Sequence, residues 1–175
     1  MTRILLVDDE INVLNALVRA MRQHLPLADL HIETFIDPFD ALSRCAEASF
    51  DIVISDFRMP TMNGVEFLHA MMETAPTTVR MILSASTEFD TVSRAISEAH
   101  VFRYISKPWQ MGDLQESIRT ALLYRAELLA NERLGDTLRL QTGQLTAQEA
   151  EARQLEREEP GLTKVKWGPK GEILM

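Results

Sequence analysis

The 175-residue chain has little cysteine, few aromatic side chains and no long apolar run. Its single cysteine, Cys45, cannot form an internal disulfide, which is typical of a reducing compartment, and its position in a predicted helix favours a packing role over a reactive thiol. No stretch approaches the ~18 apolar residues of a membrane-spanning helix. Met1 leads directly into an apolar strand pattern rather than a signal peptide, so we expect a cytoplasmic protein.

Positive charge is also scarce in this sequence. The net charge is −8, from 18 Lys and Arg against 26 Asp and Glu, whereas a phosphate-binding surface needs clustered Lys and Arg. The pattern contains no basic helix and no second domain, so we expect no direct DNA binding. The last segment, residues 160–175, differs in composition, with three lysines against one glutamate.

Short apolar runs alternate with segments of helical spacing from residue 3 to about residue 124. The runs are residues 3–7, 30–35, 51–55, 79–85 and 101–106, and the helical segments start near residues 11, 38, 64, 89 and 111. The first run, RILLV, has no polar alternation, which is typical of a strand covered on both faces. Asp37 and Pro38 mark one helix start as N-cap and first helical residue. The order predicts an α/β doubly wound parallel sheet, with the flavodoxin-like strand order 2-1-3-4-5.

Polar residues stand at the end of four of these predicted strands or directly after it. They are Asp8, Asp9, Asp56, Ser84 and Lys107. Right-handed crossovers place the carboxyl ends of parallel strands at one edge, where ligands bind in open α/β sheets. Carboxylates about 5 Å apart repel by about 3 kcal/mol at an effective dielectric of 20, so the predicted site requires a cation. Mg²⁺ prefers oxygen ligands and fits such a set.

A carboxylate beside a metal and a lysine is equipped to accept a phosphoryl group as an aspartyl phosphate. The metal neutralises the transferred oxygens, the lysine ammonium holds one of them, and the hydroxyl of Ser84 bonds another. Each residue alone has a simpler interpretation. The acids of residues 8–10 would oppose a helix dipole, Asp56 would be a loop acid, Lys107 a loop cation, and Tyr104 a packing residue. The placement of all these residues at one edge favours the phosphoacceptor site.

Four motifs in this order carry a family resemblance. They are DDE at 8–10, DxxMPxMxG from Asp56 to Gly64, the pair Ser84-Ala85, and the pair Lys107-Pro108. Together they resemble the receiver domain of two-component response regulators, over residues 2 to about 124. We therefore expect a receiver domain at residues 1–124, followed by a helical segment at 125–159 and a short tail at 160–175.

The resemblance implies a role for each residue of the edge. Asp56 is the implied phosphoacceptor, Lys107 the phosphate-binding lysine, and Ser84 with Tyr104 the switch pair. The implied Mg²⁺ ligands are Asp8, Asp9, Asp56 and the backbone carbonyl of Arg58. A sensor histidine kinase is the implied phosphoryl donor, with a downstream protein as the second partner. Ser84 stands where the family more often has Thr, and Arg58 and Ser86 occupy the positions that tune the lifetime of the phosphoryl group.

Two other functions fit the same residues less well. Mg²⁺-dependent phosphatases of the haloacid dehalogenase type have a second Asp two residues after the nucleophile, where this chain has Arg58. A flavin phosphate needs a hydroxyl-rich or glycine-rich loop after the first strand, and the acidic DDE would repel it. We expect only self-phosphorylation and self-dephosphorylation. The stretch HVFRYISKPW resembles receivers attached to cyclic-dinucleotide or enhancer-dependent transcription outputs, so a receiver fragment whose output domain is absent stays open.

Residues 125–159 predict an extension of the last helix. A heptad stripe with steps of four and three consists of Leu134, Leu138, Gln141, Leu145, Gln148, Ala152 and Leu155. Gly135 and Gly143 each cost about 1 kcal/mol relative to Ala, and Thr146 with Glu149 matches a capping box that would restart a helix. A homodimeric coiled coil is preferred, with a docking site for a partner helix and a single solvated helix as alternatives.

The tail has apolar residues on both sides of a GPKG turn. Val165 and Trp167 precede the turn, and Ile173 and Leu174 follow it. This pattern predicts a two-stranded hairpin, which is marginal without further contacts. A disordered tail is the alternative.

Overall fold

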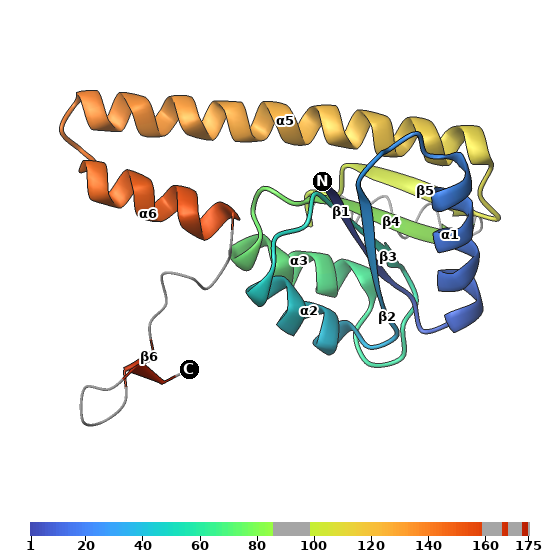
Figure 1. Cartoon of the computed structure of the whole chain (residues 1–175). Coiled ribbons are helices and arrows are strands. Elements are labelled where there is room, and N and C mark those ends of the chain that lie inside the picture. Colours follow the sequence, from blue (N-terminus) through green and yellow to red (C-terminus); the bar gives the residue numbers. More distant parts are fainter. Residues whose placement is uncertain (86–98, 159–165, 168–172, 175) are drawn as a thin grey trace.

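The computed structural model describes residues 1–85, 99–158, 166–167 and 173–174. Its main sheet has five parallel strands in the order β2-β1-β3-β4-β5 (Figure 1). The strands are β1 (Thr2–Val7), β2 (Leu30–Phe35), β3 (Ile52–Asp56), β4 (Val79–Ala85) and β5 (Arg103–Lys107). The predicted flavodoxin-like strand order is confirmed.

Helices connect these strands and extend beyond them. They are α1 (Ile11–His24), α2 (Pro38–Glu47), α3 (Gly64–Thr74), α5 (Met111–Gln141) and α6 (Ala147–Glu158). At the start of α2, the Asp37 carboxylate accepts a hydrogen bond from the Phe39 N–H at 2.8 Å, so the predicted N-cap is confirmed. The helix predicted from residue 89 falls almost wholly outside the described residues, as does Ser86.

Two apolar layers hold the helices on the sheet. Alternate residues of a strand point to opposite faces, so Ile4 and Leu6 of β1 pack in the layer of α1 and α5, while Leu5 and Val7 pack in the layer of α2 and α3. All four side chains are at most 1% exposed, and burying each contributes about 2 kcal/mol. The unbroken apolar run of β1 follows from its central position between both layers.

The loop between β3 and α3 is fixed where α3 begins. The Asn63 side chain accepts hydrogen bonds from the N–H groups of Val65 and Glu66, and the Glu66 carboxylate accepts one from the Asn63 N–H, completing a capping box. A Cβ at Gly64 would overlap the backbone carbonyl oxygen of Asp56. Gly64 therefore lets α3 begin directly against the end of β3.

Helix α5 belongs to the sheet at one end only. It has 31 residues and a length of about 46 Å. Leu114, Ile118 and Ala121 are buried on the sheet, whereas the part beyond Arg125 projects past it, and α6 returns beneath this projecting part (Figure 1).

The segment 142–146 is a turn, so residues 125–159 do not form one continuous helix. Gly143 has a φ of 71°, a conformation that favours glycine. The Gln144 N–H donates to the Arg139 carbonyl at 2.8 Å, which closes the end of α5. Thr146 and Glu149 exchange hydrogen bonds as the predicted capping box. The turn divides the heptad stripe between two helices.

Two short strands lie near the end of the chain. β6 (Lys166–Trp167) and β7 (Ile173–Leu174) pair antiparallel, as the predicted hairpin requires. Among the described residues, no helix combines the length and the apolar character that crossing a bilayer requires.

Candidate functional site

Strand register brings the predicted site residues to one edge of the sheet. Val7 is level with Ser55 of β3, so the next residues, Asp8 and Asp56, are neighbours. Asp56 is level with Leu83 of β4, and Ala85 is level with Lys107 of β5. Four strands therefore place their carboxyl ends side by side.

Asp8, Asp56 and Lys107 are in direct contact. The Lys107 Nζ donates to Asp8 Oδ2 at 2.7 Å and forms an ion pair with Asp56 Oδ1. The other oxygen of each carboxylate accepts a backbone N–H two residues on, from Glu10 at 2.9 Å and from Arg58 at 2.7 Å. Both carboxylates are thus held in position by the lysine and by the chain itself.

Together, Asp8, Asp56 and Lys107 carry a net charge of −1, and the two carboxylates are buried. Asp8 is 1% exposed and Asp56 is 6% exposed. Burial raises the pKa of the Asp56 carboxyl above its ordinary value, against the lowering effect of Lys107, and the charge of Asp8 raises it further. Burial works to lower the pKa of Lys107, but its bonds to Asp56 and Asp8 outweigh burial and raise that pKa. The site therefore favours an added cation or a neutralising reaction.

Ser84 of β4 and Tyr104 of β5, the predicted switch pair, are joined by a hydrogen bond. Ser84 is buried at the end of β4. The Tyr104 hydroxyl donates to the carbonyl oxygens of Ser84 and Ala85, both at 3.0 Å. A displacement of the Ser84 backbone would therefore change the hydrogen bonds of the Tyr104 ring directly.

The remaining predicted ligands are less closely assembled. Asp9 is exposed at the rim, and Arg58 contacts Asp56 through its N–H. Among the described residues, no group of three or more His, Cys, Asp or Glu side chains is arranged to hold a metal ion. The donor set that is assembled, the carboxylates of Asp8 and Asp56, consists of hard oxygen ligands with a net negative charge, which suits Mg²⁺ with retained waters.

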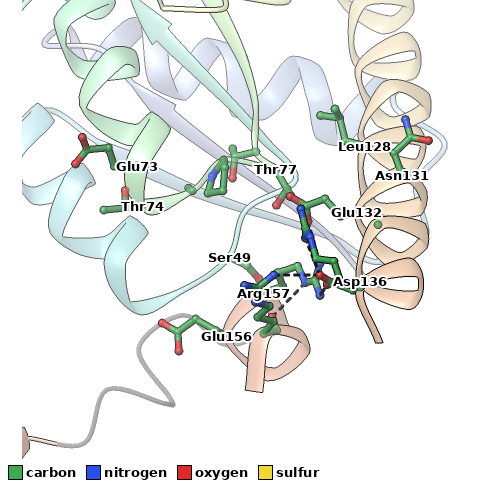
Figure 2. A pocket seen from close by; sticks show the side chains of 16 residues that line it. Ser49, Glu73, Thr74, Thr77, Leu128, Asn131, Glu132, Asp136, Glu156 and Arg157 are labelled. Carbon is green, nitrogen blue, oxygen red and sulfur yellow. Dashed lines mark hydrogen bonds and ion pairs between the residues drawn. The ribbon is translucent and has the colours of Figure 1, made fainter. Parts of the chain in front are cut away.

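A second feature of the structure, a cavity, lies away from this site. It has a volume of about 750 Å³ and is lined by residues of α5, α6 and the segments that precede β3 and β4 (Figure 2). Ser49, Thr77 and Thr78 of its lining come before their strands, so the cavity is at the amino edge of the sheet. The carboxyl edge with Asp56 is at the opposite end of the strands.

One charged cluster in this region was not predicted from the sequence. Asp136 of α5 pairs with Arg153 and Arg157 of α6. Glu132 and Asp136 are four residues apart on one helix, as are the two arginines on the next. This matched spacing on both sides of the Gly143 turn was the signal that could have revealed the pairing.

A parallel five-stranded sheet of this order, with acids and a lysine at its carboxyl edge, is the architecture of a signalling receiver domain. The chain matches the response regulator receiver domain over residues 4–119, so it belongs to that family. Receiver domains are signalling domains and not classical enzymes.

Individual relatives agree with this membership. The chain is 34% identical over 125 residues to the hydrogenase transcriptional regulatory protein HoxA of Bradyrhizobium diazoefficiens, covering 71% of this chain and 25% of that protein. The signal receiver domain of an HD domain-containing protein from Pseudomonas fluorescens has a TM-score of 0.65 and 30% identity, covering 72% of this chain and 98% of its own. A receiver domain protein from Clostridium thermocellum has a TM-score of 0.65 and 27% identity, covering 74% and 99%. The chain spans about a quarter of the length of the HoxA relatives.

Proposed function

We propose that this chain is a phosphorylation-controlled signalling protein of a two-component system. Asp56 accepts a phosphoryl group from a sensor histidine kinase, with Mg²⁺ held by Asp8, Asp9, Asp56 and the Arg58 backbone carbonyl. The protein acts in the cytoplasm, through contact with a downstream protein and through self-association of its C-terminal helical segment, without direct DNA binding.

The observation that carries this proposal is the contact of Lys107 with both Asp8 and Asp56. A structural ion pair would need one carboxylate for one lysine. Two buried carboxylates on a single lysine leave a negative site, and burying an unbalanced charge is costly unless it serves a ligand or a reaction. The raised pKa of Asp56, caused first by burial, is in line with a reactive carboxylate.

The proposed reaction is a phosphoryl transfer to a carboxylate oxygen of Asp56. That oxygen attacks the phosphorus, the bond from phosphorus to the donor breaks, and the departing donor atom keeps the electron pair and takes up a proton. Bound Mg²⁺ would supply charge neutralisation for the phosphoryl oxygens. Lys107 contacts the attacking carboxylate and is positioned to bind one phosphoryl oxygen.

The signal would pass from Asp56 to β5 and α5. A phosphoryl group adds negative charge and acceptor oxygens, so the Ser84 hydroxyl is drawn toward it. Because Tyr104 is bonded to the Ser84 and Ala85 carbonyls, its ring reorients with them. Shifting the face formed by β5 and α5 from 1% to 99% in its switched conformation needs about 5.5 kcal/mol of differential stabilisation.

Incubation with Mg²⁺ and a small phosphodonor such as acetyl phosphate tests the acceptor. Intact-mass spectrometry should detect one added phosphoryl group on the wild-type chain and none on Asp56→Asn. Asp29→Asn makes the same chemical change at an exposed loop position and should be modified like the wild type. Equal modification of Asp56→Asn and Asp29→Asn would overturn the assignment.

A further inference from the structure

Asp136 is a buried carboxylate far from the phosphoacceptor edge. It is 7% exposed, although it lies on the part of α5 that projects past the sheet. Its Oδ2 accepts from Arg157 Nη2 at 2.6 Å, and its Oδ1 accepts from Arg139 and Arg153 at 3.1 and 3.2 Å. Arg157 also donates to Glu132 Oε2 at 3.1 Å. We call these five residues the Asp136 cluster, and Figure 2 shows Asp136, Glu132 and Arg157 within it.

Helix α6 is attached to the rest of the molecule mainly by polar contacts. None of its residues is buried. Besides the Asp136 cluster, the backbone carbonyl of its last residue, Glu158, accepts a hydrogen bond from the Ser49 hydroxyl at 3.1 Å. The 750 Å³ cavity separates α6 from the amino edge of the sheet (Figure 2). Apolar packing therefore contributes little to holding α6 in place.

The leucines of the heptad stripe are left on the outside of this arrangement. Leu134 is 63% exposed, Leu138 is 61% exposed and Leu155 is 41% exposed, whereas Leu145 is buried in the turn. In a continuous helix through residues 134–155, all four would lie along one side. The closed hairpin thus keeps apart the residues that a helical dimer would bury together.

We propose that the Asp136 cluster controls self-association by holding α6 against α5, and that opening it releases residues 134–155 as a helix that pairs with a second copy of this chain. This inference rests on the proposed function, because it explains how the proposed self-association is regulated. The second copy is the chosen partner because a stripe with steps of four and three fits an identical stripe.

The arrangement has the features of a two-state element. The closed state is favoured by the Gly143 conformation, the capping box at Thr146 and the ion pairs of the Asp136 cluster. The open state is favoured by burial of exposed leucines on both copies. The arginine side chains of the Asp136 cluster are 23% to 52% exposed, so salt screens their pairing with Asp136 and favours the open state.

Spin labels on the two helices measure the opening in the full-length chain. Labels at Arg133→Cys and Gln154→Cys, with the buried Cys45 changed to Ala, should give one short distance in the closed hairpin. A continuous helix would place the two positions on the order of 30 Å apart. Asp136→Asn keeps the shape of the side chain and removes its charge. It should raise the open fraction about tenfold, as should 0.5 M salt in the wild type.

Sedimentation of the same unlabelled variants measures the consequence. Both copies must open before they pair, so a tenfold change in opening should tighten the apparent dimer affinity by about a hundredfold. Glu127→Gln removes one exposed charge of α5 outside both the Asp136 cluster and the heptad stripe. This control should leave the distance and the affinity unchanged.

The two readouts separate this inference from the proposed function. Opening together with tighter association in Asp136→Asn supports the inference. If the distance between the labels stays short in Asp136→Asn, the Asp136 cluster is not the controlling contact. Self-association and phosphorylation of the chain are then judged by their own measurements. Opening without association overturns the inference together with the homodimer, and leaves the phosphoacceptor assignment untouched.

Discussion

At the scale of single residues, Lys107 contacts two carboxylates, and its substitution should affect Mg²⁺ binding and phosphorylation in different ways. Lys107→Ala takes a positive charge away from Asp8 and Asp56, so Mg²⁺ should bind at least as tightly as in the wild type. Phosphorylation should slow by about a hundredfold, because a group that binds the transferred phosphoryl oxygen is lost. Calorimetric titration with Mg²⁺ and the rate of modification by acetyl phosphate measure the two effects.

The matched control for this variant is Arg119→Ala, which removes an exposed cation paired with Glu116 on α5. It should change neither Mg²⁺ affinity nor phosphorylation. A Lys107→Ala chain that loses Mg²⁺ binding and keeps its phosphorylation rate would contradict the role given to Lys107.

Glu33 is the residue with a clear pH signature. Its carboxylate pairs with Arg44 at 2.7 Å and with Arg3 at 2.9 Å. The hydrogen bond from Arg44, opposed by burial and aided by Arg3, lowers its pKa from 4.5 to about 2. A lowered folded-state pKa stabilises the fold above the unfolded pKa of 4.5, and this stabilisation is lost as the pH falls through about 2.

Glu33→Gln should therefore lower the free energy of unfolding by about 1 kcal/mol at pH 7. The difference from the wild type should shrink between pH 4.5 and pH 2. Urea unfolding at pH 7, 4 and 3 measures this dependence. Glu47→Gln, at a 70% exposed side chain that also pairs with Arg44, should show no comparable change, and a difference for Glu33→Gln that stays constant with pH would contradict the assignment.

At the scale of elements, the start of α3 fixes the backbone that carries Asp56. A Cβ at Gly64 meets the Asp56 carbonyl, and a backbone atom cannot move aside as a flexible side chain would. Gly64→Ala should cost about 2 kcal/mol of stability and slow phosphorylation by displacing Asp56. Gly112→Ala, where a Cβ meets no atom within 4 Å, should be neutral or stabilising by up to about 1 kcal/mol. Equal effects in urea unfolding would contradict this close approach.

The elements of the sheet were predictable because local patterns define them. The RILLV run, the Asp37 N-cap and the Thr146 capping box all depend on neighbours within a few residues, and each is present in the structure. The predicted strand 51–55 is instead Ile52–Asp56, because Asp56 still pairs with β4. The α5–α6 hairpin was not predicted, since its ion pairs join residues 17 and 21 positions apart. The heptad stripe also keeps its spacing across the turn, so the stripe by itself does not reveal that the helix is interrupted.

The position of the candidate site was predictable because local patterns also define where each strand ends. The alternating elements place Asp8, Asp56, Ser84 and Lys107 on one edge, and the structure brings Lys107 into contact with both acids. Which acids would meet the lysine was not predictable, because Asp8 and Asp9 are adjacent in sequence and only the pleat decides which one turns inward. Asp8 is buried and Asp9 is exposed.

At the scale of the whole molecule, the proposed phosphoacceptor site and the Asp136 cluster lie toward opposite edges of one sheet, and α5 extends from one toward the other (Figure 1). Arg125 of α5 pairs with Asp51 before β3 at 2.6 Å, which fixes the helix where it leaves the receiver fold. Through this helix, the proposed change on the α5 face would reach the projecting part.

A chain shortened to end at Arg125 keeps this ion pair and loses the heptad stripe. It should take up a phosphoryl group at the rate of the full chain, because every proposed site residue precedes Arg125. In 0.5 M salt it should sediment as a monomer, while the full chain associates. A shortened chain that still dimerises would place the interface within the receiver domain.

The central claim, that Asp56 is the acceptor, has one direct measurement. The full chain is phosphorylated with Mg²⁺ and acetyl phosphate and then treated with borohydride, which reduces an aspartyl phosphate to homoserine at the residue that carried it. Peptide sequencing by mass spectrometry should find homoserine at position 56, in proportion to the phosphoryl group incorporated. Homoserine at Asp8 or Asp9 instead, or phosphoryl incorporation without homoserine at position 56, would contradict the account.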